Sequence, residues 1–186
     1  MILPIYAYGQ PVLKQVAKDI TPDYPELKEL IHNMWETMYQ ANGVGIAAPQ
    51  VGLGIRLFVI DSTQINDEMR KGEVGIKRVF INAHKIEESG PLWNYEEGCL
   101  SIPHVRGDVE RHDTLKIRYQ DENFETHEQT FHGINARVIQ HEYDHIDGVL
   151  FTERLKPLKK KLIQRKMNDI LGGKIRTDYK MRFAKR

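Results

Sequence analysis

The stretch "GINARVIQHEYDHIDGVLF", residues 133–151, contains two histidines four positions apart and a glutamate directly after the first. Residues four apart on an α-helix project from the same face, so His141 and His145 could bind one metal ion. Glu142 would lie about 100° around the helix from His141, close enough to move a proton on a metal-bound water but not placed as a ligand. The pattern predicts a helix over residues 135–147 with a hydrolytic metal site, although an ordinary charged helix can match so short a pattern by chance.

A catalytic zinc-type site needs a third protein ligand and an open position. Phe151 stands where a third histidine would extend the pattern, and no glutamate follows Glu153. The remaining soft ligand is the single cysteine, Cys99, in "YEEGCLSIP" (95–103), which a metal would hold as a thiolate. Lone cysteines are more often small buried side chains. Cys99 is nevertheless the best candidate, expected on an exposed loop before a strand.

The small residues of "NGVGIAAPQVGLG" (42–54) would let a backbone approach another group closely. The segment lacks the lysine and the spacing of a phosphate-binding loop. Gln50 could donate an amide N–H to a developing oxyanion. A tight turn that leads into a strand would have a similar composition, so this segment alone does not decide the function.

Helical and strand-like segments surround these motifs. "PELKELIHNMWETMYQANG" (25–43) has apolar residues at helical spacing, a proline suited to its first turn and a glycine suited to its end. A shorter helix is expected after Pro11. Buried or alternating strands are predicted in four segments: 56–61, 78–82, 114–120 and 125–131. A polar insert at 62–77 separates the first two strands.

The segment 155–173 predicts a C-terminal amphipathic helix that ends at Gly172 and Gly173. Its apolar line is expected to consist of Leu158, Leu162, Met167 and Ile170. The order of helix, strands, helix and helix favours an α+β fold. Antiparallel strands would pack around a central metal-binding helix, with one helix N-terminal and one C-terminal to them.

The charge is unevenly distributed along the chain. The formal net charge is only +1, but residues 154–186 hold 13 lysines and arginines against two acids, while residues 1–153 hold 14 basic and 24 acidic side chains. A basic C-terminal region on an acidic body suits an anionic partner. A solvated helix would have the same composition, and both interpretations remain open.

The overall composition is that of a globular protein, with 186 residues, 40% of them hydrophobic and 28% charged. This length suits one domain with a full core. No apolar run approaches the roughly 20 residues of a membrane helix, and the first residues lack the basic start of a secretory signal. One cysteine excludes an intrachain disulfide, so a cytoplasmic location is expected.

Three motifs together resemble the signatures of the peptide deformylases, in the order of that family: "GVGIAAPQ" (43–50), "EGCLS" (97–101) and "QHEYDHIDG" (140–148). The resemblance extends from the first helix to the last, with a longer insert at 62–77 and a basic extension after Gly173 as departures. It implies one catalytic domain over residues 1–173 and an extension over 174–186. The implied reaction removes the formyl group from the N-terminal formyl-methionine of new polypeptides and releases formate.

The resemblance also implies roles for individual residues. Cys99, His141 and His145 would bind the metal, and Glu142 would be the general acid and base. Gln50 and the backbone N–H of Leu100 would stabilise the oxyanion. The substrate would be bound as an added strand beside Gly45 and Gly98, and Glu97 is expected to be a further substrate-binding residue. Glu97 is further expected to pair with Arg111 and thereby to hold the segment of Cys99 and Leu100 in shape.

The family natively uses Fe(II) and commonly accepts Zn(II) or Ni(II), and one thiolate with two imidazoles would bind any of these. Some members dock on the ribosome through their C-terminal helix, so the basic helix and tail could bind there. Because the ligands precede Asp147, removal of residues 174–186 is expected to spare hydrolysis of small formyl-peptides. Two alternatives remain: a zinc metallopeptidase of the HExxH type, and an RNA- or ribosome-binding protein with a structural metal.

Overall fold

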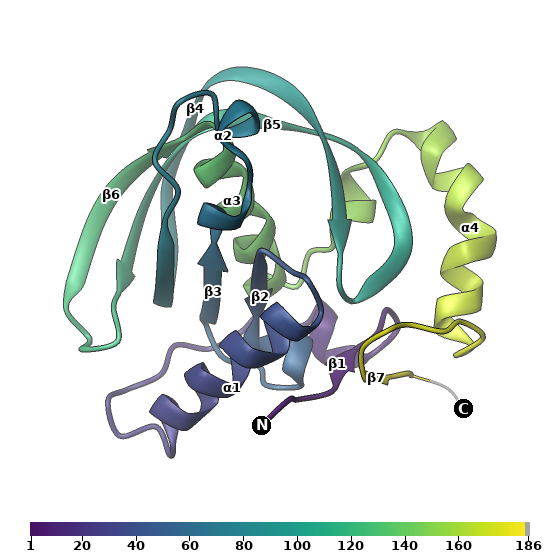
Figure 1. The fold of residues 1–186 in the computed structure, drawn as a ribbon, viewed down its shortest axis with the longest axis horizontal. Helices are drawn as coiled ribbons and strands as arrows, with labels where there is room; N and C mark the ends of the chain where they lie inside the picture. The colour runs from purple at the N-terminus through teal and green to yellow at the C-terminus, as the bar shows by residue number, and fades with distance from the viewer. Residues whose placement is uncertain (185–186) are drawn as a thin grey trace.

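The structure, a computed structural model that describes residues 1–184, combines a curved antiparallel sheet with helices, one of which lies in the concave side of the sheet (Figure 1). The five strands of this sheet have the spatial order β2-β3-β4-β5-β6, and a separate parallel pair joins β1 to β7. The strands are β1 (Ile5–Tyr6), β2 (Gly45–Ala47), β3 (Leu57–Asp61), β4 (Lys77–Cys99), β5 (Ile102–Gln120), β6 (Thr126–His132) and β7 (Met181–Arg182). The α-helices are α1 (Leu27–Gln40), α2 (Asp67–Arg70), α3 (Gly133–Ile146) and α4 (Pro157–Leu171).

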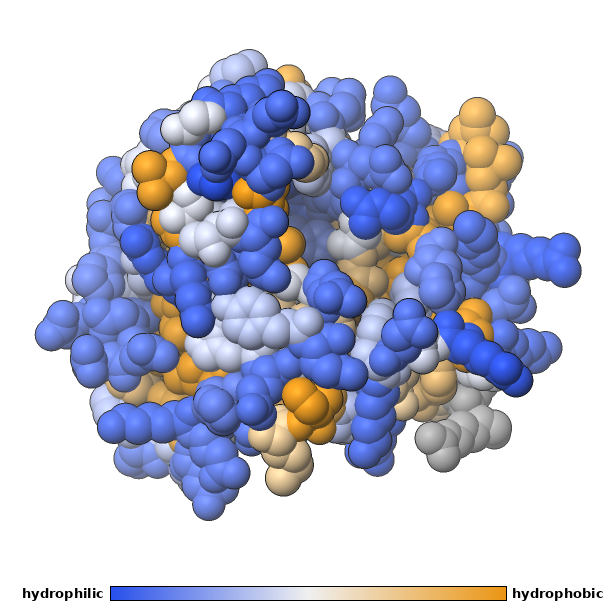
Figure 2. All heavy atoms as spheres, in the orientation of Figure 1, coloured by the Kyte–Doolittle hydropathy of each residue, from blue (hydrophilic) through white to orange (hydrophobic). Residues whose placement is uncertain are grey.

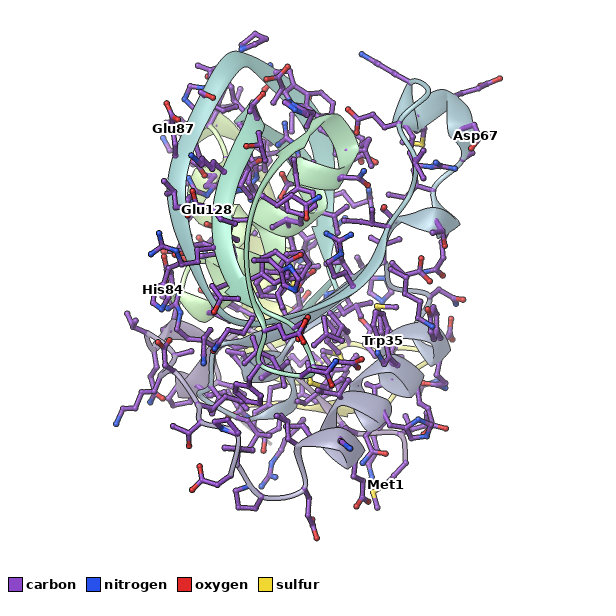
Figure 3. The ribbon with its side chains drawn as sticks, turned by 90° about the vertical axis from the view of Figure 1, so that its left-hand side faces the viewer. Met1, Trp35, Asp67, His84, Glu87 and Glu128 are labelled. Atoms are coloured by element: carbon purple, nitrogen blue, oxygen red, sulfur yellow. The ribbon has the colours of Figure 1, made fainter. Side chains whose placement is uncertain are left out.

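The predicted mixture of helices and antiparallel strands is therefore confirmed. Short 3-10 turns link the larger elements: η1 (Pro11–Lys14), η2 (Ala48–Val51), η3 (Ser62–Gln64) and η4 (Phe151–Arg154). The insert at 62–77 contains η3 and α2. Figure 3 shows Asp67 of this insert on the opposite side of the molecule from His84, Glu87 and Glu128 of the sheet.

Helix α1 buries the apolar face that its spacing predicts, including Leu27, Ile31, Met34 and Met38. It begins after Glu26, whose backbone is left-handed with φ at 53°, so the helix starts two residues later than Pro25 would suggest. The small residues that follow it lead into β2, which pairs antiparallel with β3 and forms one edge of the sheet.

Strands β4 and β5 form a long bent hairpin that arches over α3 (Figure 1). The predicted strands at 78–82 and 114–120 are only parts of it. Irregular register near Ile81, Lys85 and Ser89 accompanies the bending, as bulges do. The expectation of an exposed loop at Cys99 was wrong, because this residue ends β4 and is partly buried.

Helix α3 lies in the concave side of the sheet, where it contacts β2, β3, β5 and β6. Most of its side chains are buried, including the charged or polar Arg137, Glu142, Asp144 and His145. Buried charges are costly unless they are paired or bind an ion. Helix α3 therefore carries several buried charged groups that need partners.

Helix α4 packs against β5 through Ile163, Met167 and Ile170. The expected apolar line was wrong for Leu158 and Leu162, which are each 70% exposed. Residues 163, 167 and 170 follow the i, i+4, i+7 spacing of one helical face, and the two leucines lie on a neighbouring face turned outward. Figure 2 shows hydrophobic side chains at the surface in this region.

The chain ends meet in the β1–β7 pair, where Ile5 is opposite Met181 and Tyr6 is opposite Arg182. The Ile5 amide donates to the Lys180 carbonyl at 2.9 Å, and the Ala7 amide donates to the Arg182 carbonyl at 3.0 Å. The domain boundary at residue 173 stays a prediction, but the described part of the extension contacts the rest of the chain. Lys185 and Arg186 of the basic tail lie outside the described residues.

Candidate active site

A pocket of about 460 Å³ opens between the edge strand β2, helix α3 and the turn between β4 and β5. Figure 2 shows a hollow near the middle of the molecule in this view. Eight of the nine site residues that the sequence singled out line the pocket: Gly45, Gln50, Glu97, Gly98, Cys99, Leu100, His141 and Glu142. The ninth, His145, lies beside Cys99. The three separate motifs thus converge at one place.

Three soft donor atoms lie close together at the bottom of this pocket. A side-chain donor atom from each of Cys99, His141 and His145 lies within 4.8 Å of the other two. Cys99 Sγ is 3.3 Å from His145 Nε2. One thiol and two imidazoles in this arrangement match the three-ligand set of a catalytic metal site. The predicted i, i+4 pair on α3 and the end of β4 supply these donors.

Glu97 controls the orientation of the first histidine. His141 Nδ1 lies 2.8 Å from Glu97 Oε1, which leaves the other ring nitrogen free to face Cys99. A carboxylate partner of this kind fixes the tautomer of a metal-binding histidine. The Glu97 side chain is only 4% exposed and is held by His141, and its expected role in substrate binding stays a prediction.

The predicted ion pair between Glu97 and Arg111 is confirmed. Arg111 donates from Nε at 2.8 Å and from Nη2 at 3.0 Å, which is a bidentate contact. Arg137 adds a third bond from Nη1 at 2.8 Å. Burial alone would raise the pKa of Glu97, but the hydrogen bonds from His141 and Arg111 outweigh it and hold this pKa far below its usual range.

Sequence reasoning missed the rest of this buried network. Arg111 Nη1 also donates to Asp144 at 2.9 Å, and Arg154 donates to the same carboxylate at 2.7 and 2.8 Å. Arg137 and Asp144 lie on α3, four residues before and three residues after His141. Their helical spacing from His141 could have indicated that these charged residues lie near the site, but the sequence did not show that they are buried.

Gln50 is 1% exposed and its amide is held in a defined direction. Its Oε1 accepts from the Ala47 amide at 2.9 Å, so the Nε2 group points into the site. Nε2 lies 3.2 Å from Ser101 Oγ and 3.5 Å from Cys99 Sγ. An oriented donor beside a reacting carbonyl is the arrangement that stabilises an oxyanion. Ser101 was not singled out from the sequence, although it belongs to the "EGCLS" motif.

Glu142 is a buried carboxylate that lacks a partner for one oxygen. Its Oε2 atom has no hydrogen bond within the described residues, and the side chain lies deep in the pocket. Burial raises the pKa of Glu142 to about 7, although the charges of His141 and His145 lower it. A carboxylate with a pKa near neutrality can both accept and release a proton. Such an unpaired group is a common mark of a reactive or ion-binding site.

The surroundings of the Cys99 thiol lower its pKa and so favour the thiolate. Burial alone would raise its pKa, but the charge of His145 and hydrogen bonds from both histidines outweigh this effect and lower the pKa to about 5. A thiolate is the form that binds metals. The donor set and the unpaired Glu142 oxygen therefore fit a divalent cation.

Two glycines let the backbone lie close to charged side chains at the pocket: Gly45 against Glu142, and Gly98 against Arg106. A Cβ atom at Gly45 would lie 2.6 Å from Glu142 Oε1, and one at Gly98 would lie 2.7 Å from Arg106 Nη1. Distances of this size are far below van der Waals contact. Any larger residue at Gly45 would displace the buried carboxylate. Because β2 is an edge strand, the pocket is bordered by backbone that could pair with an extended peptide.

A thiol, two imidazoles and a buried carboxylate, set beside an oriented amide in an antiparallel α+β fold, define the class of metal-dependent hydrolases. Comparison with known proteins narrows this class. The family model described as "Polypeptide deformylase" matches residues 2–161. The chain belongs to the polypeptide deformylase family.

Two curated relatives are similar over nearly their whole length. The peptide deformylase of Christiangramia forsetii is 57% identical over 98% of this chain and 96% of its own length. The peptide deformylase of Flavobacterium johnsoniae is 56% identical over 99% of this chain and 97% of its own length. The motifs 43–50, 97–101 and 140–148 all fall inside the matched region.

Solved structures show the same fold. The peptide deformylase of Thermotoga maritima superposes with a TM-score of 0.74 at 39% identity and covers 84% of this chain and 99% of that structure. An inhibitor complex of Plasmodium falciparum peptide deformylase gives a TM-score of 0.77 at 33% identity, with 89% and 97% coverage. The chain is thus an enzyme that removes N-formyl groups, and the metallopeptidase alternative is not favoured.

Proposed function

We propose that Cys99, His141 and His145 hold the catalytic divalent metal of this deformylase and that Glu142 moves the proton. The observation that carries this assignment is the convergence of three donor atoms within 4.8 Å beside a buried carboxylate oxygen that has no partner among residues 1–184. When bound, such a metal supplies Lewis acidity and lowers the pKa of a coordinated water. The remaining steps fall to groups of the chain itself.

The substrate binds as an extended strand between the β2 edge and the end of β4. Gly45 and Gly98 have no side chain of their own at these borders, where a Cβ would meet Glu142 and Arg106 respectively, so the formyl-methionine backbone can approach closely. The formyl group is directed at the base of the pocket. Its oxygen accepts hydrogen bonds from Gln50 Nε2 and from the Leu100 backbone N–H, and these bonds strengthen as negative charge develops.

Glu142 transfers the proton during hydrolysis. Its carboxylate takes a proton from the water that attacks the formyl carbon, and a C–O bond forms. The C–N bond then breaks, Glu142 delivers the proton to the amine nitrogen, and formate leaves. A pKa of about 7 suits both halves of this transfer near neutral pH. Glu97 acts indirectly, since it orients His141.

The native ion is proposed to be Fe(II), with Zn(II) or Ni(II) as functional substitutes. One thiolate and two imidazoles accept all three ions, so the donors present are compatible with each. Sensitivity to oxygen distinguishes iron from nickel. The activity of the iron form should decay in air, whereas the activity of a nickel-substituted sample should persist. Equal stability of the two preparations would argue against iron.

New formyl-methionyl polypeptides are the proposed substrates, in the cytoplasm and near the ribosome. No helix within residues 1–184 is long and apolar enough to cross a membrane. The outer side of α4 presents exposed Leu158 and Leu162 among exposed basic residues, namely Lys160, Lys161, Arg165 and Lys166. Basic side chains that bind ribosomal phosphates release counterions, so this association should weaken steeply with salt.

Formate release tests the proposed function directly. The purified protein, loaded with nickel, is incubated with a formyl-methionyl peptide and with the same peptide lacking the formyl group. We expect formate from the first peptide and no peptide-bond cleavage in either. Cleavage of the unformylated peptide without formate release would instead identify a metallopeptidase.

A further inference from the structure

Tyr179, in the segment after α4, contacts the active site across the fold. Its hydroxyl donates a 2.7 Å hydrogen bond to the carbonyl oxygen of Leu100, 79 residues earlier in the chain. Its side chain also lines the pocket that contains Cys99 and Glu142. Leu100 lies in the tight turn that joins β4 to β5, directly after the cysteine.

Further contacts hold this turn and the beginning of β5, from the N-terminal segment, from α4 and from the segment after α4. The Tyr8 amide donates to the Ser101 carbonyl at 2.8 Å. His104 Nε2 lies 2.9 Å from the Arg176 carbonyl, and Lys166 Nζ donates to the His104 carbonyl at 3.3 Å. The β1–β7 pair, in turn, joins the segment of Tyr8 to that of Tyr179. The carbonyls of Leu100 and Ser101 are therefore fixed by opposite ends of the chain.

We propose that Tyr179 is a positioning residue of the deformylase reaction, which acts through Leu100. This inference rests on the proposed role of the Leu100 N–H in the oxyanion site. The hydroxyl restrains the Leu100–Ser101 peptide plane and so limits rotation about Leu100. That restraint keeps the Leu100 N–H directed at the formyl oxygen. A small change in the direction of this hydrogen bond would weaken the stabilisation of the transition state.

The alternative is that Tyr179 only fills space. Its ring packs against the larger hydrophobic core cluster, together with Ile175 and Phe183. Tyr179→Phe separates the two roles, because phenylalanine keeps the ring and removes only the hydroxyl. A matched control is Tyr119→Phe on β5, where the lost hydroxyl accepts from Arg78 Nη1 at 3.0 Å and serves no active-site residue.

The experiment measures steady-state formate release and amide hydrogen exchange on the same nickel-loaded proteins. We expect Tyr179→Phe to lower kcat by about two- to tenfold, the range that corresponds to one neutral hydrogen bond, with KM nearly unchanged. We also expect faster exchange in the peptide that covers residues 98–104. Tyr119→Phe should change neither quantity, and thermal unfolding checks that both variants are folded.

Wild-type kcat in Tyr179→Phe would overturn the inference, and so would a lowered kcat with unchanged exchange at residues 98–104. An equal loss of kcat in Tyr119→Phe would also overturn it, because the effect would then be general. If the wild-type protein released no formate, the proposed function itself would be wrong. In that event the exchange rates alone would decide whether Tyr179 fixes the turn.

Discussion

Glu97 illustrates how a single buried side chain organises the site. Its carboxylate accepts from Arg111 and Arg137 and contacts His141, and it is only 4% exposed. An isolated charge at such depth would be very costly, so the two arginines and the glutamate depend on one another. The same group that balances the buried charge also sets the direction of a metal ligand.

We predict that Glu97→Gln lowers the free energy of unfolding of the metal-free protein by about 3–5 kcal/mol, because buried Arg137 loses its carboxylate partner and buried Arg111 keeps only Asp144. Urea denaturation measures this loss. Glu96→Gln is the matched control, since the Glu96 side chain is 62% exposed and its pair with Arg106 should contribute at most about 1 kcal/mol. Equal effects of the two substitutions would contradict the account.

The pH dependence of stability provides a second readout of the same variant. The pKa of Glu97 is far lower in the folded protein than the roughly 4.3 of an unfolded glutamate. Its stabilisation is therefore fully present above that value and is lost as the pH falls toward the folded pKa. The stability of the wild-type protein should fall more steeply below about pH 5 than that of Glu97→Gln.

Cys99 is expected to be indispensable as a ligand. Cys99→Ser should lose most of its bound metal, because a serine hydroxyl does not ionise where this thiol, with a pKa of about 5, does. Metal analysis of the purified variant is the measurement. Full metal occupancy together with wild-type turnover would eliminate Cys99 from the ligand set.

At the scale of elements, the sequence indicated which side chains converge more accurately than it indicated the strands around them. The "HEYDH" pattern placed two histidines on one face of a helix, and the structure confirms that they share a face with their rings 5.3 Å apart. The length of β4 was not predictable in the same way. Most of its residues from Glu87 to Glu96 are exposed, so pairing with β5 supports them without an alternating hydrophobic pattern.

Helix α4 shows why a helical face can be misassigned. Leucines at 158 and 162 and isoleucines at 163 and 170 offer two overlapping apolar stripes, and only the position of β5 selects between them. We predict that Ile163→Ala lowers the free energy of unfolding by about 2–5 kcal/mol, as truncation of a buried side chain does. Leu162→Ala should change it by no more than about 0.5 kcal/mol. Thermal or urea unfolding of the pair is the test, and the reverse order would restore the original assignment.

At the scale of the whole molecule, the two chain ends are built into the fold. The sequence suggested that residues 174–186 are dispensable for peptide hydrolysis, but β7 and Tyr179 lie in this segment. Such long-range contacts leave no periodic signal in the sequence. Truncation would remove them together with the positive charge, so substitutions test the role of the charge more cleanly.

We predict that Lys161→Gln combined with Arg165→Gln weakens co-sedimentation with ribosomes. The slope of log K against log salt concentration should become less steep by about one to two. Peptide deformylation should be unaffected, because both side chains are exposed on α4. The control is Lys116→Gln combined with Arg118→Gln, which removes two positive charges from β5, near Glu128, and leaves α4 unchanged. Equal effects of the two double variants would favour a solvated helix.

The central claim is that Glu142 moves the proton at a metal held by Cys99, His141 and His145. Metal content and formate release of Glu142→Gln, measured on the same sample, test it most directly. We predict wild-type metal content and a kcat lowered by about 10²–10⁴, because the carboxylate does not coordinate but carries the proton transfer. A near-normal kcat with unchanged metal would contradict the assigned role, and loss of metal would show that Glu142 is itself a ligand.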